Sequence, residues 1–229
     1  MASTAAGAPA NGVRFVLYAT TPPVSTPSRP LNALGYVDLT DQSTSGAMVL
    51  AVAVVGTTGA TPVTYASYTV ARVTAPDRVW TLAGFVTDGA TILNLTSTLM
   101  STSTLLTVQT AVDDAADGLH VSETATMPPA WKQGADFRLT SGTDTLEATG
   151  TLQPDTTGHT WGNGSMTVTL NGQSFATITV APSGESYAGA SGAQLTSADR
   201  QVLNSLFADS FSLFGAMTVL ADAGWVLNM

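Results

Sequence analysis

The 229-residue sequence contains no cysteine and few cations, with seven Lys and Arg against sixteen Asp and Glu and a formal net charge of −9. The absence of thiols excludes disulfides, thiolate metal sites and cysteine catalysis. The single lysine is Lys132. So few cations cannot neutralise a run of phosphates, which argues against nucleic-acid binding and excludes a polybasic membrane anchor.

Long hydrophobic runs are also missing. The best candidate, 47–55, has nine apolar residues, whereas a membrane-spanning helix needs about 20. Its Val and Ala content predicts a buried strand, so we expect no direct membrane span. The apolar fraction of 44% and the mean hydropathy of +0.23 are typical of a folded chain and not of a disordered one.

The compartment is predicted from composition. Residues 1–7 have neither the basic start nor the apolar segment of a signal peptide, but one Lys, no Cys and abundant Thr are typical of exported β-proteins. We therefore expect a periplasmic or extracellular protein that associates with a membrane through its partners. The cytoplasmic side is the alternative.

What the sequence does contain is a β pattern. Threonine alternates with large apolar residues, which is typical of a sheet with one wet and one buried face. Asp-Gly and Asn-Gly pairs favour two-residue type I′ turns. We expect about ten to thirteen strands in an antiparallel β-sandwich or flattened barrel over 13–194, after a flexible lead-in at 1–12. The clearest hairpins are 79–96 around Asp88-Gly89, 136–151 around Gly142 and 166–180 around Asn171-Gly172.

The C-terminal region, 195–229, breaks this pattern because its hydrophobic period changes from 2 to 3.6. Thr196 is a predicted N-cap, and Asp199 favours the positive end of the helix dipole. The helix and its uncharged tail are predicted to pack on the β domain or on a partner. The predicted apolar stripe is Val202, Leu203, Leu206, Phe207, Phe211, Phe214, Met217 and Leu220.

Two segments are predicted to contact partner subunits. The segment 20–30 contains four prolines and cannot lie inside a sheet, so it should form an extended loop. The tail 224–229 is apolar and uncharged, and such a terminus seldom stays in water. The predicted contact residues are Pro22, Pro23, Pro27, Pro30, Trp225, Val226, Leu227 and Met229.

The densest acidic stretch, 113–120, supplies weak metal candidates. Clustered carboxylates suit calcium, and Asp113, Asp114 and Asp117 are the candidate ligands. Ala115 removes the middle ligand of an EF-hand pattern, and Gly118 favours a simple turn between strands. We therefore expect a solvated loop, with no metal and no cofactor.

Catalytic motifs are not found: the sequence has no G-x-S-x-G elbow, and no phosphate-binding glycine loop precedes a helix. We predict a non-catalytic protein. Two alternatives stay open. One is a secreted glycan- or calcium-binding module, whose sugar site would use the loop residues Trp131 and Trp161. The less favoured one is a hydrolase that depends on His120 or His159.

Several stretches in order, 12–19, 30–41, 84–89, 175–180 and 192–196, together resemble uncharacterised exported β-proteins of gemmatimonad bacteria. The resemblance implies an all-β fold and assigns no activity or site residue. Because such bacteria can be phototrophic, it also implies a role as a membrane-extrinsic accessory subunit that stabilises a photosynthetic reaction-centre or light-harvesting complex. The implied partners are protein subunits of that membrane-bound complex.

Overall fold

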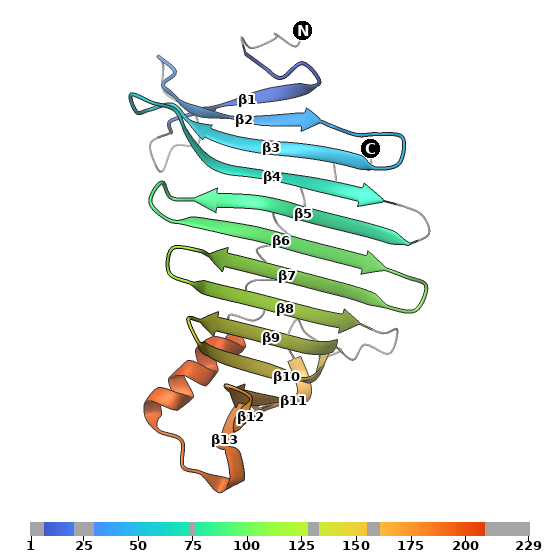
Figure 1. Ribbon diagram of the computed structural model, residues 1–229, viewed down its shortest axis with the longest axis vertical. Helices are drawn as coiled ribbons and strands as arrows, with labels where there is room; N and C mark the ends of the chain where they lie inside the picture. Colours follow the sequence, from blue (N-terminus) through green and yellow to red (C-terminus); the bar gives the residue numbers. More distant parts are fainter. Residues whose placement is uncertain (1–6, 21–29, 74–76, 128–132, 155–160, 209–229) are drawn as a thin grey trace.

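The computed structural model describes residues 7–20, 30–73, 77–127, 133–154 and 161–208. Within them, thirteen strands follow one another in a single sheet, and each strand pairs antiparallel with the next along the chain (Figure 1). The strands are β1 (Gly12–Tyr18), β2 (Ala33–Asp41), β3 (Met48–Gly56), β4 (Val63–Val73), β5 (Arg78–Thr87), β6 (Ile92–Ser101), β7 (Leu106–Asp114), β8 (Leu119–Met127), β9 (Gln133–Ser141), β10 (Asp144–Pro154), β11 (Trp161–Leu170), β12 (Gln173–Ala181) and β13 (Gly184–Gly189).

The all-β prediction with one C-terminal helix is confirmed, in the form of a continuous meander that does not close on itself. Successive side chains in a strand point to opposite faces, and directly opposite residues of paired strands share a face. The face that carries Leu50, Val70 and Leu82, which are register partners, is called the inner face here. The opposite, outer face is rich in threonine, as the alternating pattern predicts.

The inner face holds two hydrophobic clusters. One lies over β3–β6 and is built from Leu50, Val52, Val70, Leu82 and Leu95, among others. The other lies over β9–β12 and combines sheet residues such as Phe137, Met166 and Ile178 with Leu203 and Phe207 of the helix. The core therefore runs along one face of the sheet.

The predicted hairpins all form, but their turns differ. At Asn171-Gly172 both residues have positive φ, 51° and 76°, and Leu170 pairs with Gln173, as a two-residue type I′ turn requires. The same prediction at Asp88-Gly89 is wrong, because Thr87 pairs with Ile92 and leaves a four-residue loop. Asp88 stabilises that loop by accepting hydrogen bonds from the backbone N–H groups of Ala90 and Thr91 at 2.8 and 2.9 Å.

The C-terminal helix is described over 197–208 and follows β13 and a short 3₁₀ turn (Ala190–Gly192). The predicted cap is confirmed and is reciprocal. The backbone N–H of Thr196 donates to Asp199 Oδ2 at 2.8 Å, and that of Asp199 donates to Thr196 Oγ1 at 3.1 Å. Such a capping box satisfies two N–H groups that the helix itself cannot.

The helix packs on the inner face beside β9–β12 (Figure 1). Leu203, Leu206 and Phe207 of the predicted stripe are buried, but Val202 is 53% exposed. Val202 therefore does not belong to the buried core that the helix forms with the sheet. The stripe residues after 208 lie outside the described part of the chain.

We expect Thr196→Ala to lower the free energy of unfolding the helix by about 1 kcal/mol, because it removes the hydroxyl that accepts a hydrogen bond from the backbone N–H of Asp199. Amide hydrogen exchange at Leu203 and Leu206 should then accelerate about fivefold. Ser197→Ala, one residue later, is the matched control and should change exchange little. Unchanged exchange in Thr196→Ala would show that packing alone holds the helix.

Candidate functional site

The two edges of the sheet differ in how they are protected. The edge strand β13 is six residues long, and the helix lies against it. Tyr187 Oη donates to Asn204 Oδ1 at 3.1 Å, and Arg200 Nη1 donates to the Tyr187 carbonyl at 3.4 Å. Natural proteins usually cover or shorten an edge strand in this way, because a free edge is a template for pairing with another chain.

The other edge strand is β1, and no described strand pairs with its far side. In the described ranges, β1 pairs with β2 alone. Its sequence, GVRFVLY, has no proline and a single charged residue. An exposed apolar edge of this kind is a predicted site of strand addition.

Backbone groups of β1 alternate between β2 and the open side. Asn11 accepts from the backbone N–H of Asp41, and Ala19 donates to the carbonyl of Asn32. In an antiparallel ladder only every second residue exchanges both hydrogen bonds with its partner strand. Counting from Asn11, the N–H and C=O groups of Val16 point away from β2, toward the open side. The register shifts between Leu17 and Tyr18, and after this shift the bond of Ala19 to Asn32 places the groups of Tyr18 on the open side as well.

Apolar side chains of β1 extend the inner face to this edge. Val13 and Phe15 lie opposite Leu39 and Val37 of β2, which pack against the β3–β6 cluster. At the edge, however, Val13 and Phe15 are 51% and 56% exposed, and Leu17 is 40% exposed. The hydrophobic surface of the core therefore continues into solvent at β1.

The charge of β1 is neutralised within the sheet. On the outer face, Arg14 Nε and Nη2 each lie 2.6 Å from a carboxylate oxygen of Asp38, its direct register partner in β2. The guanidinium also lies 3.6 Å from the centre of the Tyr36 ring. Such a bidentate, stacked arrangement fixes β1 on β2 and leaves the edge strand without an unbalanced charge.

A second unusual feature lies in the middle of the inner face. Between the two clusters, one register row reads Leu82, Ser97, Thr110, Glu123 and Phe137. Thr110 and Glu123 are 4% and 3% exposed, and within the described part of the chain neither Thr110 Oγ1 nor Glu123 Oε2 has a hydrogen-bond partner. Burial raises the pKa of Glu123 from 4.5 to about 7. A buried carboxyl without a partner is costly and often marks a functional site.

The acidic stretch 113–120 forms the predicted turn between β7 and β8, with Gly118 at φ 63°. Asp113 and Asp114 point to opposite faces because they are adjacent in β7. Asp113 pairs with His120 Nδ1, and Asp114 accepts from the backbone N–H groups of Ala116 and Asp117 at 3.0 and 3.3 Å. No group of three His, Asp or Glu residues suited to a metal ion occurs among the described residues.

Most of the other predicted site residues lie outside the described ranges, including Pro22, Pro23, Pro27, Trp225, Val226, Leu227, Met229, Trp131 and His159. Pro30 is described and exposed. For Trp161 only the backbone, at the start of β11, is described. The sequence patterns predicted neither the open edge at β1 nor the burial of Glu123. Consecutive apolar residues at 15–18 were an available signal for β1, since a strand with one wet face alternates instead.

The chain matches no known family model, no curated protein and no solved structure. Among the described residues, no helix has the length and apolar character that crossing a membrane requires.

Glu123 should make the protein less stable as the pH rises. Between pH 4.5 and about 7 the unfolded state loses this proton while the folded state keeps it, so the free energy of unfolding falls across that range. The change amounts to about 3 kcal/mol. Glu123→Gln keeps the shape without the charge and should remove this loss.

Urea denaturation at pH 5 and pH 8 measures the effect. The variant and the wild type should be similar at pH 5, and the variant should be more stable at pH 8. Glu185→Gln, at an exposed position of β13, is the matched control. An equal pH dependence in wild type and Glu123→Gln would mean that Glu123 titrates normally.

Proposed function

We propose that this protein is a non-catalytic interaction protein that binds a partner by strand addition at β1. The observation that carries the proposal is the contrast between the edges: β13 is short and contacted by the helix, whereas β1 presents outward backbone groups and exposed Val13, Phe15 and Leu17. A partner strand would gain backbone hydrogen bonds from Val16 and Tyr18. It would also cover the apolar side chains of the inner face.

The kind of partner follows from the same chemistry. A matching segment is extended and carries apolar side chains at alternate positions, so that one face continues the inner face of the sheet. It needs no particular charge, because Arg14 is already paired with Asp38. In the setting that the sequence resemblance implies, the segment belongs to a subunit of a membrane-bound photosynthetic complex, and this protein is its exported, membrane-extrinsic accessory subunit.

A proline at position 16 tests strand addition directly. Val16→Pro removes an N–H that faces the open side and leaves the ladder with β2 intact. We expect this variant to fold normally but to lose its place in the complex, as followed by native gels and native mass spectrometry of gently solubilised membranes from the source cells. Val16→Ala keeps the N–H and is the matched control.

Two outcomes would contradict the proposal. In one, Val16→Pro associates as well as Val16→Ala does. In the other, the wild-type chain is recovered as a free monomer alone. Circular dichroism of the purified variants establishes that the proline has not unfolded the sheet.

The predicted contacts of the apolar tail and of the proline loop are part of the proposal and lie largely outside the described residues. We expect a chain truncated after Ala223 to keep its fold and to dissociate from the complex, because it loses Trp225, Val226, Leu227 and Met229. Unchanged association of the truncated chain, with an unchanged melting temperature, would restrict the interface to β1 and the loop.

A further inference from the structure

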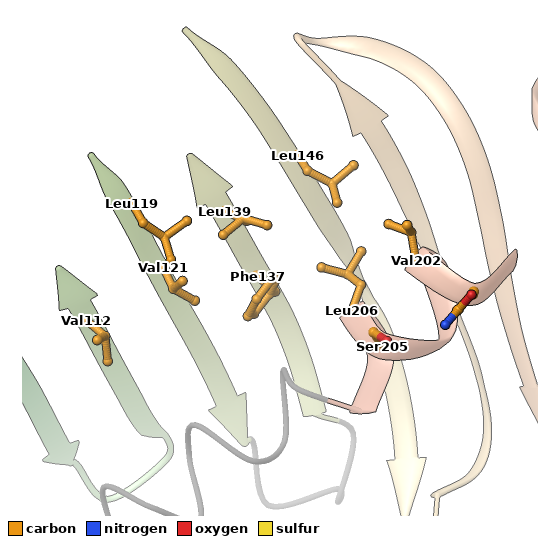
Figure 2. Close-up of a pocket in the computed structure, with 10 residues that line it drawn as sticks. Val112, Leu119, Val121, Phe137, Leu139, Leu146, Val202, Ser205 and Leu206 are labelled. Atoms are coloured by element: carbon orange, nitrogen blue, oxygen red, sulfur yellow. The ribbon is translucent and has the colours of Figure 1, made fainter. Parts of the chain in front are cut away.

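A hollow of about 690 Å³ lies between the inner face of the sheet and the C-terminal helix. Its floor is one register row across four neighbouring strands: Val112, Val121, Leu139 and Leu146. The helix contributes Val202 and Leu206, and these side chains and those of the sheet project toward the same space (Figure 2). The volume is within the usual range for small-ligand sites, which are mostly apolar with a few polar groups.

The shape of this hollow suits one extended aliphatic chain. Four strands are separated by three spacings of about 4.8 Å, so the apolar floor is roughly 14 Å long. Leu119 and Val202, which also line the hollow, are 36% and 53% exposed. The hollow is therefore open to solvent at these two residues, and a ligand can enter without unfolding the sheet.

Glu123 and Thr110 lie beside the floor of the hollow, each two residues along its strand from a lining residue, Val121 or Val112. Phe137 lines the hollow and is the direct register partner of Glu123. Val121, which also lines it, precedes Glu123 by two residues and shares its face. On the next strand, Thr110 is the register partner of Glu123, and its hydroxyl also has no partner among the residues that the structure describes. Two buried oxygen atoms able to accept hydrogen bonds thus lie one register row away from the apolar floor, just outside the residues that line the hollow.

We propose that this hollow binds a single-chain cationic amphiphile, with its alkyl chain along the apolar floor and its ammonium head group paired with Glu123 and Thr110. A donor head group satisfies these two oxygens, which have no hydrogen-bond partner in the described ranges. The register neighbours of Glu123 on the inner face are neutral, so a cation there meets no opposing positive charge. The net charge of −9 also favours cations, whereas an anionic head group would face a like charge.

Binding of decylammonium, decanol and decanoate to the full-length chain, measured by isothermal titration calorimetry at pH 8, tests this site. We expect one decylammonium per chain, with decanol weaker and decanoate weakest. Val202→Trp fills the mouth of the hollow from an exposed position and should weaken binding at least about tenfold. Ala198→Trp, on the same helix but outside the hollow, is the control, and Leu119→Trp is a second blocking variant if Val202→Trp disturbs the helix.

Glu123→Gln tests the contact of the ligand head group separately from the contact of its alkyl chain. It should abolish the preference for decylammonium over decanol while decanol still binds. Absence of saturable binding to the wild type would overturn the proposal, as would unchanged affinity in both blocking variants or a preference that survives Glu123→Gln. The site is independent of strand addition, because Val16→Pro lies at the opposite end of the sheet and should bind decylammonium normally.

Discussion

Backbone pairing between neighbouring strands holds this molecule together more than any single contact does. Each strand from β2 to β12 hydrogen-bonds to its predecessor and successor, so that its side chains have neighbours on both sides that are set by the register. Opposite residues of paired strands share a face, so the register places Leu50, Val70 and Leu82 in one row. Such rows form a hydrophobic core from strands that could not bury their side chains individually. A shift by one residue in any strand would move its apolar set to the outer face.

A meander that does not close ends in two edge strands, and these two strands differ in what contacts them. At β13 the helix approaches, and Arg200 donates to the carbonyl of Tyr187. At β1 the strand is longer, apolar and, within the described residues, paired on one side only. Closure would have removed both edges, so the open sheet creates the surface on which the proposed interaction rests.

Among the polar side chains of the inner face, Thr110 and Glu123 are buried between the two hydrophobic clusters. The same pairing that aligns the apolar rows places this carboxyl between two hydrophobic clusters, beside a hollow that the helix closes on one side. The helix consequently has two roles: Leu203 and Phe207 complete the core, and Val202 and Leu206 form one wall of the hollow. Its reciprocal cap at Thr196 and Asp199 fixes where that wall begins.

Local patterns were enough to predict the strands, the capped helix and the turn at Asn171-Gly172, because alternation, capping and positive φ are properties of a few adjacent residues. Asp88-Gly89 shows the limit of such rules, since the carboxylate of Asp88 stabilises a longer loop there. The period of two is the same in a sandwich, a barrel and an open sheet, so the strand order, the open edge at β1 and the exposure of Phe15 were decided only by tertiary structure. In the sequence, nothing distinguishes Glu123 from the other acidic residues, of which there are sixteen in total. Its position in the inner face beside Thr110 and Phe137 comes from the pairing of β8 with β7 and β9, which a sequence pattern does not specify.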